Sequence, residues 1–535
     1  MAEEVNLDLL DLKIMYPNTM LLDYLYKKKP MADFFGSVSE KMHPVPFHGD
    51  RGVIKDVLMK YNKSIDAENP TLENIEAIEN DNVKFVITGQ QPGLFSGPLY
   101  TIYKTFSAIN YAKKYSTEKL KLIPLFWNAS EDHDVQEVDN IRILDKQNNV
   151  EQLKFKSDPY LGKSLENIKI DHKQFQELLQ KYKESLIETE FTETVFGKLG
   201  SILKKSELWG EFFSRVLSFL MKQWGLIILE PKILRPYLKD YFSAVISEPI
   251  KYNRIFQKTT DSLTDLGYKP KMHKKEDVVG LFYIDSEANR LTINLQDKDT
   301  YTLDNGTNFT REEILNEIQA HPERFSTNAI FRPLAQDTMI PTHIFVGGPS
   351  EIGYHIQIKD LYKEFNLTQP NITFRMGATV IERHINKIIE KYEFTLCELR
   401  DLHKLSSRLV ANENNQILQS RFDEISGTLD TITKDLTNYN NELGSLVGHR
   451  KKSIMKELEN IQKMYIKYVK DDNQLLMNQL TKTRAYLFPS DIPQERMFNI
   501  FQYLNKYSFS LLDCMRNLLT KNQPGKHVVL KCWMF

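Results

Sequence analysis

The sequence predicts an α/β protein with a doubly wound parallel sheet, two insertions and a C-terminal helical coiled-coil arm. Short β-branched and apolar runs alternate with helical patterns as far as about residue 380. Glycine-rich turns follow two of these runs, as at the strand-to-helix switches of parallel sheets. Beyond residue 380 the pattern is almost wholly helical and contains an apolar heptad repeat.

The clearest unit lies near residue 83. Val83 to Thr88 form a β-branched apolar run, which is typical of a buried strand. A turn rich in glycine and proline follows at 89–98, and we expect a helix at 99–115 and a second strand at 120–127. Such a βαβ unit is parallel and right-handed by default.

Three later runs complete the predicted sheet. They lie at 225–229, 343–346 and 371–376, and a helix is expected at 350–365. Five parallel strands would place their carboxyl ends at one edge, where doubly wound sheets bind ligands. These elements define a first domain over residues 1–380.

Two insertions interrupt this domain, at about 141–224 and 270–330. The first is polar and has a helical period. The second contains a β-meander at 278–303. Thr310 and Glu313 match a capping box, which predicts the start of a short helix.

A coiled-coil prediction for 381–480 rests on apolar residues at alternating spacings of four and three. They are Leu418, Phe422, Ile425, Leu429, Ile432, Leu436, Tyr439, Leu443 and Leu446. Heptads of this kind indicate a left-handed coiled coil. We expect an antiparallel arm with candidate turns at the polar break 412–415 or at Gly444 and Gly448, and a homodimer formed through it. We expect residues 481–535 to form a helical segment that packs back on the first domain.

Composition narrows the class of protein. The 535 residues include 70 Lys+Arg and 71 Asp+Glu, whereas nucleic-acid binders carry a basic excess, so no nucleic-acid partner is expected. The three cysteines lack CxxC spacing, which argues against a disulfide framework or a zinc site. No long apolar window and no signal-peptide pattern occur. We therefore expect a cytoplasmic protein without membrane contact.

The glycine-rich turn is the first candidate site. Gly89, Gly93 and Gly97 are spaced by four, which matches neither the dinucleotide nor the P-loop pattern. Glycines nevertheless let a ligand approach the backbone, and a helix N-terminus attracts anions. We expect the turn and its helix to bind substrate through Thr88, Gln90, Gln91, Gly93, Ser96, Gly97 and Lys104. A purely structural loop is the alternative.

The second candidate site follows the second strand. Trp127 ends this strand, and Glu131, Asp132, His133 and Asp134 come shortly after it. Such a cluster can orient an amine or act as a general base, so we assign catalysis to Asp132, His133 and Asp134. Trp127 and Glu131 are assigned to substrate binding. Ligands of a divalent metal and an acidic helix N-terminus are the two alternatives.

The third candidate site follows the run at 343–346. Gly347 and Gly348 open a helix on which Glu351 and Tyr354, three residues apart, share one face. We expect all four to line the same crevice as the other two sites. A weaker prediction is a second anionic pocket near the C-terminal end, formed by Arg484, Tyr486, Arg496 and Lys506.

Taken together, these residues resemble a known family, that of the bacillithiol biosynthesis cysteine-adding enzyme. The similarity is carried by residues 86–104, by Phe126–Trp127 with 131–134, and by 346–349 with Glu351. The resemblance implies a Rossmann-like core, two insertions like connecting peptides, and a coiled coil used for dimerisation. It also implies a ligase that joins cysteine, through its carboxylate, to the amine of glucosaminyl malate.

The resemblance further implies a nucleotide. By analogy with class I synthetase folds, ATP would activate the cysteine carboxylate as an acyl-adenylate or acyl-phosphate, with ADP as an alternative bound form. Mg²⁺ is expected only alongside the nucleotide, and the two synthetase signature motifs are absent from the sequence. Two other functions remain open: a metal-dependent hydrolase of sugar amides with residues 131–134 as ligands, and a non-catalytic coiled-coil scaffold.

Overall fold

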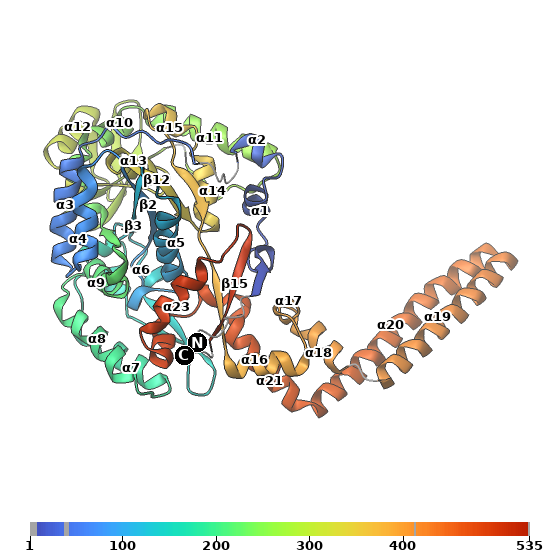
Figure 1. Ribbon diagram of the computed structural model, residues 1–535. Helices are drawn as coiled ribbons and strands as arrows, with labels where there is room; N and C mark the ends of the chain where they lie inside the picture. The colour runs from blue at the N-terminus through green and yellow to red at the C-terminus, as the bar shows by residue number, and fades with distance from the viewer. Residues whose placement is uncertain (1–7, 37–41, 276, 411–412, 533–535) are drawn as a thin grey trace. The chain divides into compact units, whose positions relative to one another are not determined.

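The computed structural model describes residues 8–36, 42–275, 277–410 and 413–532 (Figure 1). The chain forms two compact units. The first comprises residues up to 380 together with 493–530, and the second comprises 381–492 with a few residues near the C-terminus. Within the described residues, no helix is long and apolar enough to span a membrane.

A five-stranded parallel sheet forms the centre of the first unit, in the order β13-β12-β2-β3-β6. Its strands are β2 (Val83–Gln90), β3 (Lys121–Asn128), β6 (Ile227–Leu229), β12 (Thr342–Gly347) and β13 (Asn371–Phe374). Nearly every residue in them is buried, as the apolar runs require when helices cover both faces. The predicted doubly wound, Rossmann-like sheet is confirmed.

The strand order reverses between β2 and β12. From β2 the chain passes to β3 and β6 on one side, whereas β12 and β13 lie on the other. Helix α5 (Leu99–Tyr115) packs on the sheet, where Ala108 and Ala112 meet Val86 and Ile344 in one buried cluster. A crevice at the carboxyl ends of the strands is expected at such a switch point.

Further helices surround this sheet (Figure 1). They are α1 (Thr19–Leu25), α2 (Met31–Phe34), α3 (Arg51–Ser64), α4 (Asn69–Glu76), α10 (Lys239–Ser247), α11 (Pro249–Asp265), α13 (Arg332–Met339), α14 (Pro349–Gln357) and α15 (Leu361–Glu364). The helix expected at 350–365 is therefore divided into α14 and α15. The capping interaction of Gly348 and Glu351 fixes the start of α14, since the Gly348 amide donates to Glu351 Oε2 at 2.7 Å.

The insertions form their own small substructures. The first contains α6 (Val135–Val138), the hairpin of β4 (Asn140–Leu144) and β5 (Val150–Lys154), then α7 (His172–Ser185), α8 (Thr192–Lys205) and α9 (Trp209–Met221). The second is an antiparallel sheet of β7 (Val278–Ile284), β8 (Arg290–Leu295), β9 (Thr300–Leu303), β10 (Asn308–Thr310) and β11 (Phe325–Thr327), with helix α12 (Arg311–Ala320). The capping box predicted from Thr310 and Glu313 opens α12.

The chain returns to the first unit at 493. This return contains α22 (Phe501–Tyr507), α23 (Ser510–Leu519) and β15 (Lys526–Cys532). Strand β15 pairs antiparallel with β1 (Asp8–Asp11) near the N-terminus. The Leu99 amide at the start of α5 donates to the Phe498 carbonyl at 2.8 Å, so the returning chain lies against the glycine-rich turn.

The second unit is helical. Its helices are α16 (Arg383–Tyr392), α17 (Leu396–Leu399), α18 (Leu402–Val410), α19 (Glu413–Tyr439), α20 (Asn441–Asp472) and α21 (Gln474–Leu487). Helices α19 and α20 run antiparallel, because Gln462 Nε2 donates to Gln419 Oε1 at 2.8 Å and Lys451 pairs with Asp430. The homodimer expected through this arm stays a prediction.

The heptad repeat does not form one continuous helix. Helix α19 ends at Tyr439, so Leu443 and Leu446 belong to α20. Asn440 makes the turn, and its side-chain oxygen accepts hydrogen bonds from the amides of Glu442 (2.8 Å) and Leu443 (3.2 Å). The candidate turn residues Gly444 and Gly448 lie inside α20 instead. Of the polar break at 412–415, residue 412 lies outside the described residues and 413–415 lie in α19.

Candidate active site

A cavity of about 510 Å³ lies at the carboxyl ends of the central strands, on both sides of the switch point. Gly89 and Gln90 line it from β2 and Trp127 from β3, while Gly348 follows β12 and Arg375 follows β13. The strand ends named in the sequence analysis therefore do meet at one crevice, as the rule for doubly wound sheets requires.

The glycine-rich turn is held rigid from behind by Asn499. Its Nδ2 donates to the carbonyls of Phe95 (2.9 Å) and Gly97 (2.8 Å). Gly97 has a φ of +68°, and a Cβ at Gly93 would lie 2.7 Å from the Gly97 Cα atom, so both positions need glycine. Ser96 is buried within the turn.

Two amides of this turn, those of Gly93 and Gly97, donate within their own loop. The Gly93 amide donates to the Gln91 carbonyl and the Gly97 amide to the Leu94 carbonyl, both at 2.9 Å. Thr88 Oγ1 donates to the Val346 carbonyl at 2.9 Å and ties β2 to β12. These two amides are therefore not free to bind an anion as the amides of a P-loop do, whereas the side chains of Arg332 and Arg496 line the cavity.

Lys104 fastens the turn to helix α14. Its ammonium group donates to the Gly89 carbonyl (2.7 Å) and to Gln90 Oε1 (3.0 Å), and it pairs with Glu351 Oε2 at 2.5 Å. Burial lowers the pKa of Lys104, while the Glu351 carboxylate opposes this shift. Because three acceptors match its three N–H groups, Lys104 fixes the cavity wall.

An acidic patch lies on the wall that β3 contributes. Gln91 Nε2 donates to Asp132 Oδ2 at 2.7 Å and to Glu137 Oε2 at 2.8 Å. All three residues line the cavity. Asp132 Oδ1 also accepts from the His133 amide at 2.7 Å, which orients its carboxylate. This patch can bind a cation such as a substrate ammonium, and it can accept a proton.

The residues next to Asp132 in the sequence, Glu131, His133 and Asp134, are not among those that line the cavity. His133 lies beside Arg290 and Phe282, and burial, with help from the Arg290 charge, lowers its pKa. Glu131 is buried beside Arg235, and burial raises its pKa. Asp134 is exposed. Of the four residues predicted together, Asp132 is the one that lines the cavity.

Arg332 also lines the cavity. Its guanidinium donates to the Tyr354 hydroxyl at 2.5 Å and lies 5.8 Å from the ring centre of Trp127. Gly348, Tyr354 and Trp127 line the cavity there, and Gly347 is buried just behind them at the end of β12. Among the described residues Arg332 forms no ion pair with a carboxylate, so it can bind an anionic group.

Arg375 is held by a buried network. It donates to Glu495 at 2.8 and 2.6 Å and to the Tyr16 hydroxyl at 2.7 Å. Burial opposes ionisation of Glu495, but the Arg375 charge outweighs it and keeps the pKa of this carboxyl low. The ring of Tyr100 lies 5.6 Å from both Arg375 and Arg496, and burial raises the pKa of its hydroxyl.

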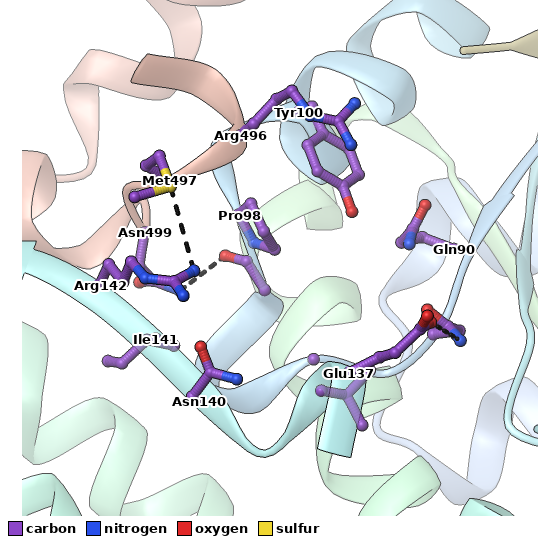
Figure 2. A pocket seen from close by; sticks show the side chains of 14 residues that line it. Gln90, Pro98, Tyr100, Glu137, Asn140, Ile141, Arg142, Arg496, Met497 and Asn499 are labelled. Carbon is purple, nitrogen blue, oxygen red and sulfur yellow. Dashed lines mark hydrogen bonds between the residues drawn. The ribbon is translucent and has the colours of Figure 1, made fainter. Parts of the chain in front are cut away.

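A side recess of about 160 Å³ adjoins the cavity. Gln90, Gln91, Tyr100, Glu137 and Arg496 line both spaces. The recess is closed by the two glycines of the turn, by β4 and by the returning chain, and its lining adds Gly93, Gly97, Pro98, Val138, Asn140, Ile141, Arg142, Met497 and Asn499 (Figure 2).

The four residues of the predicted second anionic pocket are divided between the two units. Arg496 lines the cavity, and Lys506 lies on α22 of the same unit. Arg484 pairs with Asp491, and the Tyr486 ring packs 5.0 Å from that of His384, all within the second unit. The pocket as a whole stays a prediction.

No group of three or more metal-ligating side chains is arranged to hold an ion in the part of the chain that the structure describes. This agrees with the separate directions of residues 131–134. Charged side chains line the site: the arginines Arg332, Arg375 and Arg496 and the carboxylates Asp132 and Glu137. Such a lining suits small ionic substrates.

Several residues of the site carried no sequence signal that we recognised. Arg375 follows a strand and could have been found by the same rule, but the strand was predicted to run through it. Arg332 and Arg142 come from segments far along the chain from the turn. Glu137 and Tyr100 lie on helices, and the sequence does not specify which face of each helix is turned towards the cavity.

Comparison with known proteins gives a consistent result. Residues 7–376 match the family described as Bacillithiol biosynthesis BshC, N-terminal Rossmann-like domain, and residues 378–532 match its C-terminal coiled-coil domain. Proteins named "Putative cysteine ligase BshC" from Bacillus cytotoxicus and Bacillus cereus are each 28% identical, over 89% of both chains. A solved structure titled as a putative arginyl-tRNA synthetase from Campylobacter jejuni aligns over 87% of this chain and 98% of that chain, at 8% identity and a TM-score of 0.21.

Proposed function

Since the chain belongs to the bacillithiol biosynthesis BshC family, we propose that it is a ligase that joins the carboxyl group of cysteine to the amine of glucosaminyl malate. The observation that carries this proposal is the charge layout of the cavity. One cavity is lined both by a carboxylate patch, Asp132 with Glu137, and by the cations Arg332 and Arg496. Each substrate contributes an ammonium group and at least one carboxylate.

The carboxylate patch supports binding of the amine. An ammonium group must lose a proton before its nitrogen can attack an acyl carbon, and in this proposal Asp132, which lines the cavity, accepts that proton. The hydrogen bonds from Gln91 and from the His133 amide hold the Asp132 carboxylate in position. In the reaction the amine nitrogen bonds to the acyl carbon, the activating group leaves with the carboxyl oxygen, and Asp132 takes the proton.

Arg332 supports binding of the acyl partner. Its guanidinium is fixed by Tyr354 and by the ring of Trp127, and it has no carboxylate partner among the described residues. A planar guanidinium binds carboxylate or phosphate oxygens through paired hydrogen bonds. We therefore place the activated cysteine carboxyl group beside Arg332.

Activation of that carboxyl group requires a co-substrate, and we propose ATP. The fit is through side chains, because Arg332 and Arg496 line the cavity and the amides of Gly93 and Gly97 are engaged within the loop. Arg332 would hold the phosphates beside the acyl group, and ATP would supply a leaving group that free carboxylate lacks. Mg²⁺ would accompany the nucleotide.

The test is a reconstitution with purified protein, cysteine, glucosaminyl malate and ATP, scoring the amide product together with AMP and ADP. Asp132→Asn should lower kcat/KM by about 10²- to 10⁴-fold, the range for loss of a general base. Asp158→Asn is the matched control, since Asp158 is exposed and does not line the cavity, and it should keep full activity. Turnover of D132N within twofold of the wild type would refute the assignment, provided that the two proteins unfold at the same denaturant concentration.

A further inference from the structure

The side recess contains two guanidinium groups without an acidic partner. Arg142 contacts the Met497 sulfur at 4.0 Å, and Arg496 lies over the ring of Tyr100. Neither pairs with a carboxylate among the described residues, whereas the buried Arg235 and Arg375 do. A guanidinium carries five N–H donors, so most of the donors in this recess are available to a ligand. Figure 2 shows the two side chains entering the recess from different segments.

Hydrogen bonds and an ion pair of neighbouring residues hold the backbone of both arginines in place. Arg142 lies in β4, where it bridges to Phe498, and the next-but-one amide, of Leu144, donates to Gln502 Oε1 at 3.1 Å. Arg496 follows directly on the buried Glu495, which is anchored to Arg375. Two cations held in place before a ligand arrives lose little conformational entropy on binding it.

The remaining wall suits a small, highly charged group. Gly93 and Gly97 line the recess without side chains, and Asn140 adds a further polar group. At about 160 Å³ the recess is less than a third of the size of the adjoining cavity of about 510 Å³, so it suits a small acidic group such as a four-carbon diacid better than a substituted sugar ring. Two guanidinium groups match two carboxylates, each in a paired arrangement.

We propose that the Arg142–Arg496 recess binds the malyl dicarboxylate of the amine substrate and so selects glucosaminyl malate over glucosamine. This inference rests on the proposed function. The recess shares Gln91 and Glu137 with the acidic patch, so a substrate anchored by its diacid would extend its sugar amine towards Asp132. Arginine binds phosphate oxygens through the same paired hydrogen bonds as carboxylate oxygens. The experiment therefore compares malate, as the dicarboxylate, with ADP, as the source of phosphate.

The first arm measures binding without turnover. Wild-type protein is titrated calorimetrically with malate and, separately, with ADP, and the titrations are repeated with Arg142→Gln and Arg496→Gln. Each variant should weaken malate binding by about 10- to 100-fold, the value of a charge-assisted pair, and leave ADP binding unchanged. Arg254→Gln, at an exposed position on α11, is the control and should bind malate like the wild type. Weakened ADP binding with unchanged malate binding would overturn the proposal in favour of a phosphate site.

The second arm measures selectivity. The KM for glucosaminyl malate should rise by about 10- to 100-fold in the two variants, whereas the KM values for glucosamine and cysteine stay the same. An equal rise for glucosamine would overturn the proposal, because glucosamine lacks the diacid. Absence of amide product from the wild type, with malate binding lost in both variants, would refute the proposed function and leave the dicarboxylate site standing.

Discussion

The two units of the chain use charge in opposite ways. In the first unit the ion pair of Arg375 and Glu495 has side chains 1% and 0% exposed, and it fixes a wall of the cavity. In the second unit the pair of Lys451 and Asp430 has side chains 21% and 67% exposed and joins two helices at their surface. A buried pair costs desolvation and gains precise geometry, whereas an exposed pair contributes little of either.

Apolar residues show the same contrast. Central strands such as β2 and β12 bury their side chains almost completely. In α19 and α20, by contrast, isoleucines of the arm stay 40–44% exposed: Ile425, Ile432, Ile454 and Ile461. A pair of helices has only one shared face, so it cannot cover its whole apolar surface. The first unit is therefore built to hold a site, and the second to present a surface.

The sharpest way to break this comparison is to remove one charge from each pair. Glu495→Gln leaves the Arg375 guanidinium buried without a counter-charge, and should lower the free energy of unfolding by about 3–5 kcal/mol. Asp430→Asn should lower it by less than about 1 kcal/mol, because water screens that pair. Urea denaturation followed by circular dichroism, to which the helices of both units contribute, measures both changes. Equal losses would show that burial does not distinguish the two pairs.

A second prediction concerns pH and the same buried network. Burial, assisted by the Arg375 charge, lowers the pKa of His527 to about 4, from an ordinary value of 6.5. Between these values the unfolded chain binds a proton that the folded chain does not, so stability falls as the pH drops. The loss between pH 7 and pH 5 should be about 2 kcal/mol.

The variant His527→Gln isolates this contribution. Glutamine can keep a hydrogen bond to Thr379, which lies 2.9 Å from the His527 ring nitrogen, but it cannot titrate. The free energy of unfolding, measured with urea, should therefore fall by about 2 kcal/mol less between pH 7 and pH 5 in the variant than in the wild type. An unchanged pH dependence would place its source elsewhere, with His343, whose pKa burial also lowers to about 4, as the next residue to replace.

The fold was predictable wherever the signal is local. The run from Val83, the helix at 99–115 and the capping box at Thr310 all lie where the residue pattern placed them. The heptad repeat was misleading at Asn440, because the apolar spacing continues unchanged through the turn. What ends α19 is a side-chain cap and the pairing of two helices, and neither appears in a spacing rule.

The candidate site was predictable only in part. The rule for strand ends correctly placed Gln90, Trp127 and Gly348 at one cavity. Local sequence could not show that the Lys104 ammonium group is already bound to acceptors of the protein, which belong to Gly89, Gln90 and Glu351. Nor could it show that Arg142 and Arg496, more than three hundred residues apart, line one recess, since that depends on how the returning chain packs.

The smallest expected effects come from two glycines in the arm, and they should have opposite signs. A Cβ at Gly444 would lie 2.8 Å from the Thr437 Cα atom across the helix pair, and nothing lies within 4 Å of a Cβ at Gly427. Gly444→Ala should therefore cost about 1 kcal/mol, the low end of overpacking, since the tip of a helix pair can separate slightly. Gly427→Ala should gain about 0.5–1 kcal/mol, because alanine restricts the unfolded chain and favours the helix.

Circular dichroism during thermal unfolding measures both glycine variants, and turnover should match the wild type in each. If both substitutions stabilised the protein, α19 and α20 would not approach as closely at their tip as Gly444 and Thr437 indicate. The glycine at 444 would then be an ordinary helix-weakening residue. Opposite signs would instead show that the arm, despite its exposed charges and apolar side chains, has one tightly packed face whose register is set by its smallest residues.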